Sequence, residues 1–329
     1  MNKAIATLAR LLVRPLRKYP GLTLFCALTS LLVSGCATHI NQPDSTLSTP
    51  TTDYDVEHNL VFTPPDWPQA LQADLYRPRR EDPAPAVLMV HGGGWERRSR
   101  EDMDWIAEEL AGRGFMVMNI DHRFAPEATF PAQLYDVQVA MTWLHDHAAD
   151  LALDPEAISA FGFSSGAHLI SLMAALAGSG HELDEPYGGA RLRPKAVVAG
   201  GLPADLPAFG TGKLLKQLLG GTLAEKPDAY RNASPITHVG PETPPFFLFH
   251  GAMDSLVPLE QATAFRAKLA ANDIENQLYI MRLRGHITSF LTAGTVLDEA
   301  ASFLLRHSTS GPDRDQVKDP ETGPDSAPE

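Results

Sequence analysis

The sequence predicts an α/β fold in which a mostly parallel central sheet carries helices on both of its faces. Short apolar runs of strand length alternate along the chain with segments whose apolar residues recur at helical spacing. Several of these runs are apolar at nearly every position, which is typical of strands that are buried on both faces of a sheet. Polar residues with catalytic potential directly follow several of the runs, and catalytic groups in such folds lie at the carboxyl ends of strands.

The apolar runs give the expected strands. One or two strands lie within residues 59–62 and 71–76, and further strands are expected at residues 84–90, 115–120, 157–161, 195–200, 245–250 and 276–281. The runs at 84–90 and 115–120 show most clearly the pattern of a strand with no solvent-facing side.

The helices are expected between these strands. They span residues 101–113, 131–148, 167–176, 213–219, 259–271 and 297–306. In the first, Met103, Ile106 and Leu110 lie at helical spacing, and Gly114 ends the helix. The second shows the same spacing on one side.

Residues 162–166 read Gly-Phe-Ser-Ser-Gly and lie between an expected strand and an expected helix. This is the context of a nucleophile elbow. The flanking Gly162 and Gly166 permit a tight turn, because a side chain at either position would meet the neighbouring strand or helix. Ser164 would then lie at the start of a helix, where backbone amides and the helix dipole favour an oxyanion.

A serine nucleophile needs a base that takes its proton and an acid that orients the base. Asp254 follows the strand at 245–250 and His286 follows the last strand, so the chain order is Ser, Asp, His, as this fold requires. Asp205, after the strand at 195–200, is the competing candidate for the acid. His168, one turn into the helix after Ser164, is the competing candidate for the base.

Three consecutive glycines, residues 92–94, follow the strand at 84–90. We assign the oxyanion hole to the backbone amides of Gly93 and Gly94, together with that of Ser165. The alternatives are a plain tight turn or a phosphate-binding loop. The latter is disfavoured because neither G-x-G-x-x-G nor Gly-Lys-Ser/Thr is present.

The amino terminus has the composition of an export signal. Residues 1–20 carry five basic side chains and no acid, an apolar run follows at 22–33, and small residues precede Cys36. This pattern resembles a bacterial lipobox, which implies that residues 1–35 are a signal peptide and that Cys36 becomes a lipidated amino terminus. An uncleaved membrane anchor or a plain secretory signal are the alternatives, and the apolar run is short for a spanning helix.

Residues 36–53 are expected to form a lipidated tether, residues 54–308 the catalytic domain, and residues 309–329 a disordered acidic tail. Removal of residues 1–35 would change the net charge from −13 to −18, and either charge argues against nucleic acid as a partner. Residues 179–244 form the least regular part of the domain. They either cover the site or form a surface excursion with no role.

The assembled motifs resemble those of the α/β-hydrolase esterases and lipases with an HGGG loop, over about residues 70–306. Residues 91–95 are similar to the oxyanion loop of that family, residues 121–133 to its "YRLAPE…FPA" segment, and residues 250–258 to its "HGxxDxxVP" acid loop. His122 stands where tyrosine is usual in that segment. Hormone-sensitive-lipase-like members usually have GDSAG at the elbow, and here Phe163 and Ser165 replace its Asp and Ala. The elbow is closer to the small carboxylesterases, which include acetyl-xylan and feruloyl esterases and arylformamidases.

The resemblance implies a serine carboxylesterase acting on short acyl or aryl esters, including acetylated sugars as one option. We expect Trp95 and Phe163 to wall the acyl pocket. The sequence has no H-E-x-x-H and no paired C-x-x-C motif, so neither a metal nor another cofactor is expected. The rival hypotheses are an amidase, arylformamidase or peptidase of the same fold, and an inactive hydrolase-fold binding lipoprotein. The expected location is the cell envelope, on the periplasmic side of the inner or outer membrane.

Overall fold

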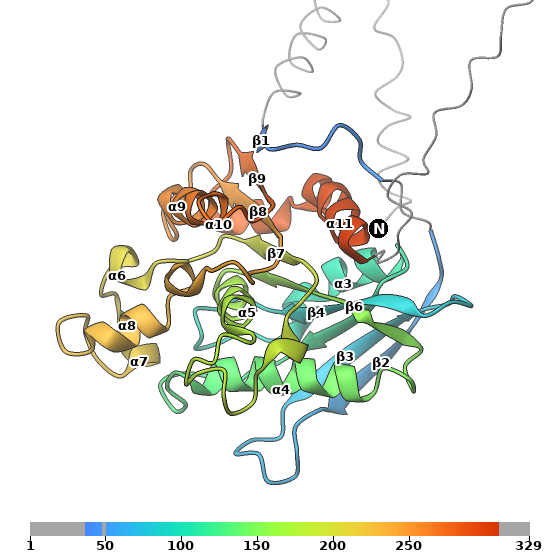
Figure 1. Cartoon of the computed structure of the whole chain (residues 1–329), viewed down its shortest axis with the longest axis horizontal. Helices are drawn as coiled ribbons and strands as arrows, with labels where there is room; N and C mark the ends of the chain where they lie inside the picture. The colour runs from blue at the N-terminus through green and yellow to red at the C-terminus, as the bar shows by residue number, and fades with distance from the viewer. Residues whose placement is uncertain (1–36, 48–50, 309–329) are drawn as a thin grey trace, which may run out of the picture.

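The computed structural model describes residues 37–47 and 51–308, and within these residues it forms one nine-stranded sheet (Figure 1). The strands are β1 (Ala37–Ile40), β2 (Tyr54–Val61), β3 (Gln72–Pro78), β4 (Ala84–Val90), β5 (Met116–Ile120), β6 (Leu153–Phe163), β7 (Val197–Gly200), β8 (Phe246–Gly251) and β9 (Asn276–Met281). Their order across the sheet is β1-β9-β8-β7-β6-β4-β5-β3-β2. Strands β4 to β9 run parallel to one another, whereas β1, β2 and β3 pair antiparallel. Every expected strand overlaps one of β2 to β9, and the predicted fold class is confirmed.

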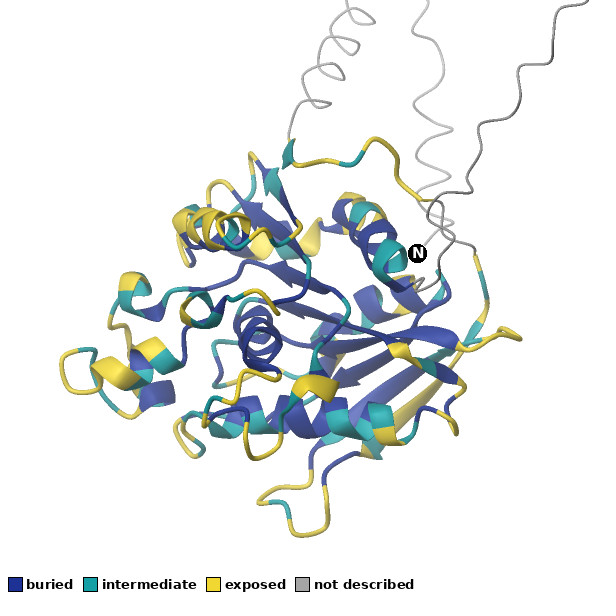
Figure 2. Cartoon of the chain, viewed as in Figure 1, coloured by how far each residue is buried: buried dark blue, intermediate teal, exposed yellow. Residues whose placement is uncertain are grey.

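Helices cover both faces of this sheet. The α-helices of the described residues are α3 (Asp104–Ala111), α4 (Ala132–Asp146), α5 (Ser165–Leu176), α6 (Leu206–Phe209), α7 (Lys213–Leu219), α8 (Pro227–Asn232), α9 (Leu259–Ala270), α10 (His286–Leu291) and α11 (Gly294–Ser308). Helices α3 and α11 pack on one face, and α4, α5 and α9 pack on the other. Figure 2 shows α5 and the central strands as the most deeply buried elements, and all twelve residues of α5 are buried. Within the described ranges, no helix combines the length and the apolarity needed to span a bilayer.

The structure differs from the expected tether at residues 37–47. Ala37–Ile40 forms strand β1 and pairs with β9, with Ala37 opposite Met281. Further along, the Leu47 N–H donates to the Ser302 Oγ at 2.8 Å. Part of the segment expected to be a tether is therefore ordered against the sheet, where β1 covers the edge strand β9, whose backbone groups would otherwise be open to pairing. Cys36, the expected signal peptide and the expected acidic tail lie outside the described residues.

Candidate active site

The predicted nucleophile lies in a sharp turn between β6 and α5. Ser164 has φ 54° and ψ −120°, a conformation that non-glycine residues rarely adopt. A Cβ at Gly166 would lie 2.1 Å from the Val90 carbonyl oxygen, and one at Gly162 would lie 2.6 Å from the Gly166 carbonyl carbon. Both glycines are needed for the close approach of β6, α5 and β4. The packed neighbours thus hold Ser164 in its strained conformation.

The structure brings the predicted nucleophile, base and acid into one hydrogen-bonded chain. The Ser164 Oγ lies 2.8 Å from the Nε2 of His286, and the Nδ1 of His286 lies 2.7 Å from the Oδ2 of Asp254. His286 is the first residue of α10, a short helix that the sequence did not predict. With the proton on Nδ1 directed at Asp254, Nε2 is free to accept the proton of the serine hydroxyl.

Three hydrogen bonds hold Asp254 as a carboxylate, and His250, whose Nε2 is bonded to the Val257 carbonyl oxygen at 2.8 Å, lies nearby. Its Oδ1 accepts from the amides of Leu256 (2.9 Å) and Val257 (2.8 Å), and its Oδ2 faces His286 and, at 3.4 Å, the Nε2 of His250. Burial alone would raise the pKa of this carboxyl. The hydrogen bonds from His286 and from the Val257 amide outweigh burial, so the pKa of Asp254 lies below its ordinary value. The acid is therefore charged and fixed where it can orient the imidazole.

Sequence reasoning did not identify Gly201 as part of this site. Gly201 has φ +57°, and a Cβ there would lie 2.8 Å from the Cε1 of His286. The missing side chain leaves room for the imidazole beside Phe163, whose ring centroid is 4.9 Å from that of His286. The Gly200-Gly201 pair at the end of β7 was the available sequence signal.

Both competing candidates occupy structural positions instead. Asp205 is the N-cap of α6, and its Oδ1 accepts from the Ala208 amide at 3.1 Å. His168 is fully buried, and its Nδ1 accepts from the Trp95 indole N–H at 3.2 Å while its Nε2 lies 2.7 Å from the Ala233 carbonyl oxygen. With both ring nitrogens engaged by other groups, His168 is not placed to serve as the base for Ser164.

Because His168 is buried and neutral, we expect it to make the stability of the folded protein depend on pH in the acidic range. Burial lowers the pKa of His168 to about 4, so the unfolded chain takes up this proton at a higher pH than the folded chain. Its contribution to stability is complete above the unfolded pKa of about 6.5 and is lost as the pH falls from there toward 4. Wild-type protein should lose stability over this range more steeply than His168→Gln, by up to about 1.4 kcal/mol per pH unit. Urea unfolding at pH 7.5, 6 and 5 measures both slopes, and equal slopes would contradict the prediction.

The predicted oxyanion donors do not all have the same surroundings. The Gly94 N–H donates to the Oγ of Ser165 at 3.1 Å, so this amide is already engaged. In the part of the chain that the structure describes, the amides of Gly93 and Ser165 have no hydrogen-bond acceptor. These two amides are available to an oxyanion, whereas the Gly94 amide would have to exchange its bond to the Ser165 Oγ for one to the oxyanion. The Ser165 hydroxyl accepts the hydrogen bond from Gly94 and so holds the loop of residues 92–94 against the start of α5.

The hydrogen-bonded chain opens into a pocket of about 430 Å³. Trp95 and Phe163, the two expected pocket walls, both line it. Residues from the irregular region 179–244 also contribute, namely Pro203, Phe209 and Leu214. Part of that region therefore shapes the pocket. Apolar side chains dominate the rest of the wall, including Leu256, Val257, Ile287, Phe290 and Leu291.

The family model described as BD-FAE matches residues 73–269, which is more than half of the 329 residues. The chain belongs to the BD-FAE family. The match spans the strands and helices from β3 to α9 and therefore includes Ser164 and Asp254, but it ends before His286.

Two curated relatives of this BD-FAE family member come from Mycobacterium tuberculosis H37Rv. The probable carboxylic ester hydrolase LipM is 32% identical over 190 residues, which cover 55% of this chain and 44% of LipM. Esterase LipC is 31% identical over 205 residues, which cover 59% of this chain and 51% of LipC. The chain thus spans about half the length of the curated relatives it matches.

The solved structure of a truncated carbohydrate esterase from gut microbiota superposes with a TM-score of 0.69. It is 23% identical, and the alignment covers 80% of this chain and all of that one. At this identity the likeness establishes the α/β-hydrolase fold.

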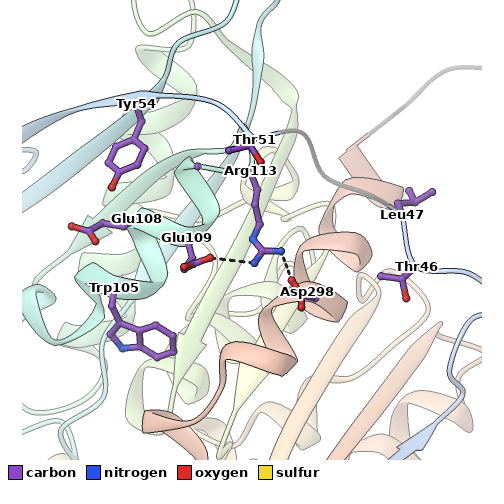
Figure 3. A pocket seen from close by; sticks show the side chains of 10 residues that line it. Thr46, Leu47, Thr51, Tyr54, Trp105, Glu108, Glu109, Arg113 and Asp298 are labelled. Carbon is purple, nitrogen blue, oxygen red and sulfur yellow. Dashed lines mark hydrogen bonds and ion pairs between the residues drawn. The ribbon is translucent and has the colours of Figure 1, made fainter. Parts of the chain in front are cut away.

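A larger cavity of about 750 Å³ lies elsewhere, between α3, α11 and the segment before β2 (Figure 3). Its Arg113 guanidinium is already paired with Glu109 at 3.2 Å and with Asp298 at 2.6 Å. No serine or histidine is among the residues that line it. The candidate active site of this BD-FAE family member is therefore not in the larger cavity. We place it in the smaller one, where Ser164 and His286 are hydrogen-bonded to each other.

The Ser165 hydroxyl gives a prediction for the oxyanion loop. Ser165→Ala removes the acceptor of the Gly94 amide. The hydrogen bond that is lost stabilises the loop by about 1 kcal/mol. If this stabilisation is lost in the transition state, kcat should fall roughly fivefold. KM should change little, because the loop orients donors for charge that develops after binding. Steady-state kinetics on a soluble ester measures both constants.

Ser171→Ala is the matched control for this variant. Ser171 lies in the same helix and is also fully buried, but its hydroxyl has no hydrogen-bond partner among the described residues. Its removal should leave kcat unchanged. A rise in kcat for Ser165→Ala would mean that the hydroxyl withholds Gly94 from the oxyanion rather than fixing the loop.

Proposed function

We propose that this chain is a serine carboxylesterase that hydrolyses short acyl or aryl esters through an acyl-enzyme. The observation that carries the proposal is the hydrogen-bonded chain Ser164–His286–Asp254 at the base of an apolar pocket. The family match and the carboxylic ester hydrolases among its relatives support the same reaction class.

In the proposed mechanism, the Ser164 Oγ attacks the ester carbonyl carbon while His286 Nε2 takes its proton. The tetrahedral oxyanion accepts hydrogen bonds from the amides of Gly93 and Ser165 at the start of α5. His286 then returns the proton to the leaving alcohol as the carbon–oxygen bond breaks, which leaves an acyl group on Ser164. Water, deprotonated by His286, attacks this acyl group, and the released acid restores the free serine. Asp254 stays ionised throughout and stabilises the imidazolium.

The pocket favours small substrates. Its volume of about 430 Å³ suits an acyl or aryl group together with part of the alcohol. Its walls are apolar near the nucleophile, which suits an acyl chain or an aromatic ring rather than a charged group. Acetylated sugars are the carbohydrate option within this range, and the likeness to a gut carbohydrate esterase is consistent with them.

A series of p-nitrophenyl esters from acetate to palmitate tests the proposal. Turnover should be fastest for acetate or butyrate and should decline with longer chains, because the pocket cannot enclose them. Matching p-nitroanilides should react far more slowly, and the opposite preference would identify an amidase. A fluorophosphonate label should attach at Ser164. Absence of both labelling and turnover would mean that the fold serves as an inactive scaffold.

We also propose that Cys36 is lipidated and holds the domain at a membrane of the cell envelope. The basic residues 1–20, the apolar run at 22–33 and the small residues before Cys36 support this proposal. Mass spectrometry of the purified chain should find an amino terminus at Cys36 with added diacylglyceryl and acyl mass. Cys36→Ala should abolish incorporation of an alkyne-tagged fatty acid, and unchanged incorporation would contradict the proposal.

A further inference from the structure

Exposed apolar side chains gather at the entrance of the active-site pocket. We call this set the entrance patch; it comprises Met253, Leu256, Leu283, Ile287 and Leu291. Each of these side chains is between 53% and 66% exposed. The patch includes more than half of the large hydrophobic side chains that are exposed in the described residues. A concentration of this kind on a soluble surface marks an interaction site.

The residues of the entrance patch come from two neighbouring loops and from α10. The Met253 N–H donates to the Arg284 carbonyl oxygen at 2.9 Å, which joins the loop after β8 to the loop after β9. Leu256, Ile287 and Leu291 also line the pocket, whereas Met253 and Leu283 lie outside it. The apolar surface therefore extends past the pocket mouth, farther than a small substrate in the pocket would need.

Strand β1 places the beginning of the described chain beside the entrance patch. Ala37 is opposite Met281, and Leu283 follows two residues later. The Nε of Arg282 donates to the Thr38 Oγ1 at 3.0 Å, which fastens the start of β1 to the end of β9. Figure 1 shows β1 next to β9 at one edge of the sheet, with β8 and α10 close by. Cys36 is bonded to Ala37, so its point of attachment lies at the same edge as the entrance patch.

Two arginines lie next to the entrance patch, although the whole chain is acidic. Arg282 and Arg284 flank Leu283, and their Nε atoms donate to the threonine hydroxyls of Thr38 and Thr292. Neither guanidinium forms an ion pair within the described residues. A guanidinium without a carboxylate partner suits the phosphate of a lipid headgroup, and such contacts add to apolar insertion at a bilayer surface.

From these features we propose that the entrance patch docks on the surface of a phospholipid bilayer, so that the mouth of the active site faces the membrane. The proposal rests on the membrane attachment at Cys36 given above. The apolar side chains enter the boundary between headgroups and acyl chains, and Arg282 and Arg284 contact the phosphates. Substrates that reach Ser164 then come from the interface, which selects amphiphilic acyl or aryl esters that partition into it.

A fluorescent probe on the patch tests this orientation with the full chain. Leu283→Cys, in a Cys26→Ser background, is labelled with the polarity-sensitive dye NBD and reconstituted into phosphatidylethanolamine–phosphatidylglycerol vesicles. Val61→Cys is the matched control, because Val61 is 49% exposed and lies on β2 at the opposite edge of the sheet. NBD at position 283 should shift to shorter wavelength and be quenched by lipids that carry a spin label in the acyl chain. NBD at position 61 should show neither effect.

Equal emission and equal quenching at the two positions would overturn the proposal, as would failure of the chain to float with the vesicles. A blue shift at position 283 that depends on protein concentration without vesicles would also overturn it, because it would identify a contact between two copies. Labelling of the Cys26→Ser parent would show that Cys36 is free and that the lipidation proposal fails; Cys36→Ser versions with added vesicles then test the patch alone. Hydrolysis of p-nitrophenyl butyrate by the same samples tests the esterase proposal separately.

Discussion

Ser164→Ala is expected to lower kcat/KM for p-nitrophenyl butyrate by about 10⁴-fold or more, since removal of a serine nucleophile ends covalent catalysis and leaves only binding and the oxyanion hole. The reason lies in the geometry. The Oγ of Ser164, the proposed nucleophile, lies 2.8 Å from the imidazole Nε2 of His286. The variant should fold normally, because alanine keeps the Cβ and the serine side chain makes no hydrogen bond to the helix as a cap.

Two measurements make this prediction specific to the nucleophile. Initial rates over a range of p-nitrophenyl butyrate concentrations give kcat/KM, and circular dichroism checks the fold. Ser165→Ala, which alters the neighbouring hydroxyl, should retain activity within about tenfold of the wild type. If Ser164→Ala kept most of the wild-type rate, the covalent mechanism would be wrong.

Asp254→Asn is expected to lower kcat by about 10³- to 10⁴-fold, as amide replacement of a triad carboxylate does elsewhere. An asparagine amide that donates to His286 Nδ1 would leave the imidazole proton on Nε2, which then faces Ser164 as a donor and cannot accept its proton. The variant also loses the negative charge that stabilises the imidazolium. Measured kcat for a soluble ester tests this, with KM expected to change much less.

Asp205→Asn is the matched control for this change. Asp205 also follows a strand, and it was the competing candidate for the acid, but its carboxylate caps α6. Asparagine is nearly as good an N-cap as aspartate, so the control should keep both its stability and its kcat. If Asp205→Asn impaired catalysis as strongly as Asp254→Asn, the roles assigned to the two carboxylates would have to be revised.

The order of strands and helices could be predicted from the sequence because their signals are local. The apolar run of residues 84–90 indicates a strand with no solvent-facing side, and it forms the interior strand β4, in which every residue is buried. The elbow could be predicted for the same reason. Its tight turn brings the backbones of neighbouring segments so close that Gly162 and Gly166 can carry no side chain. Ser164, Asp254 and His286 follow β6, β8 and β9 in chain order, and a parallel sheet places the carboxyl ends of its strands at one edge.

Features that depend on partners distant in the chain required the tertiary structure. Residues 37–40 have the composition of a linker and form β1 only because β9 offers an unpaired edge. Gly201 matters because the His286 ring, far away in sequence, occupies the space that a side chain would fill. Likewise, Gly94 and Ser165 are each predictable as oxyanion donors, but the bond between them depends on how the loop packs against α5. The sequence by itself determined the chemistry of the site, because that chemistry depends on residue types in a fixed order. The tertiary structure decided which groups are free and which surface surrounds the pocket mouth, because those depend on contacts between segments that no local pattern encodes.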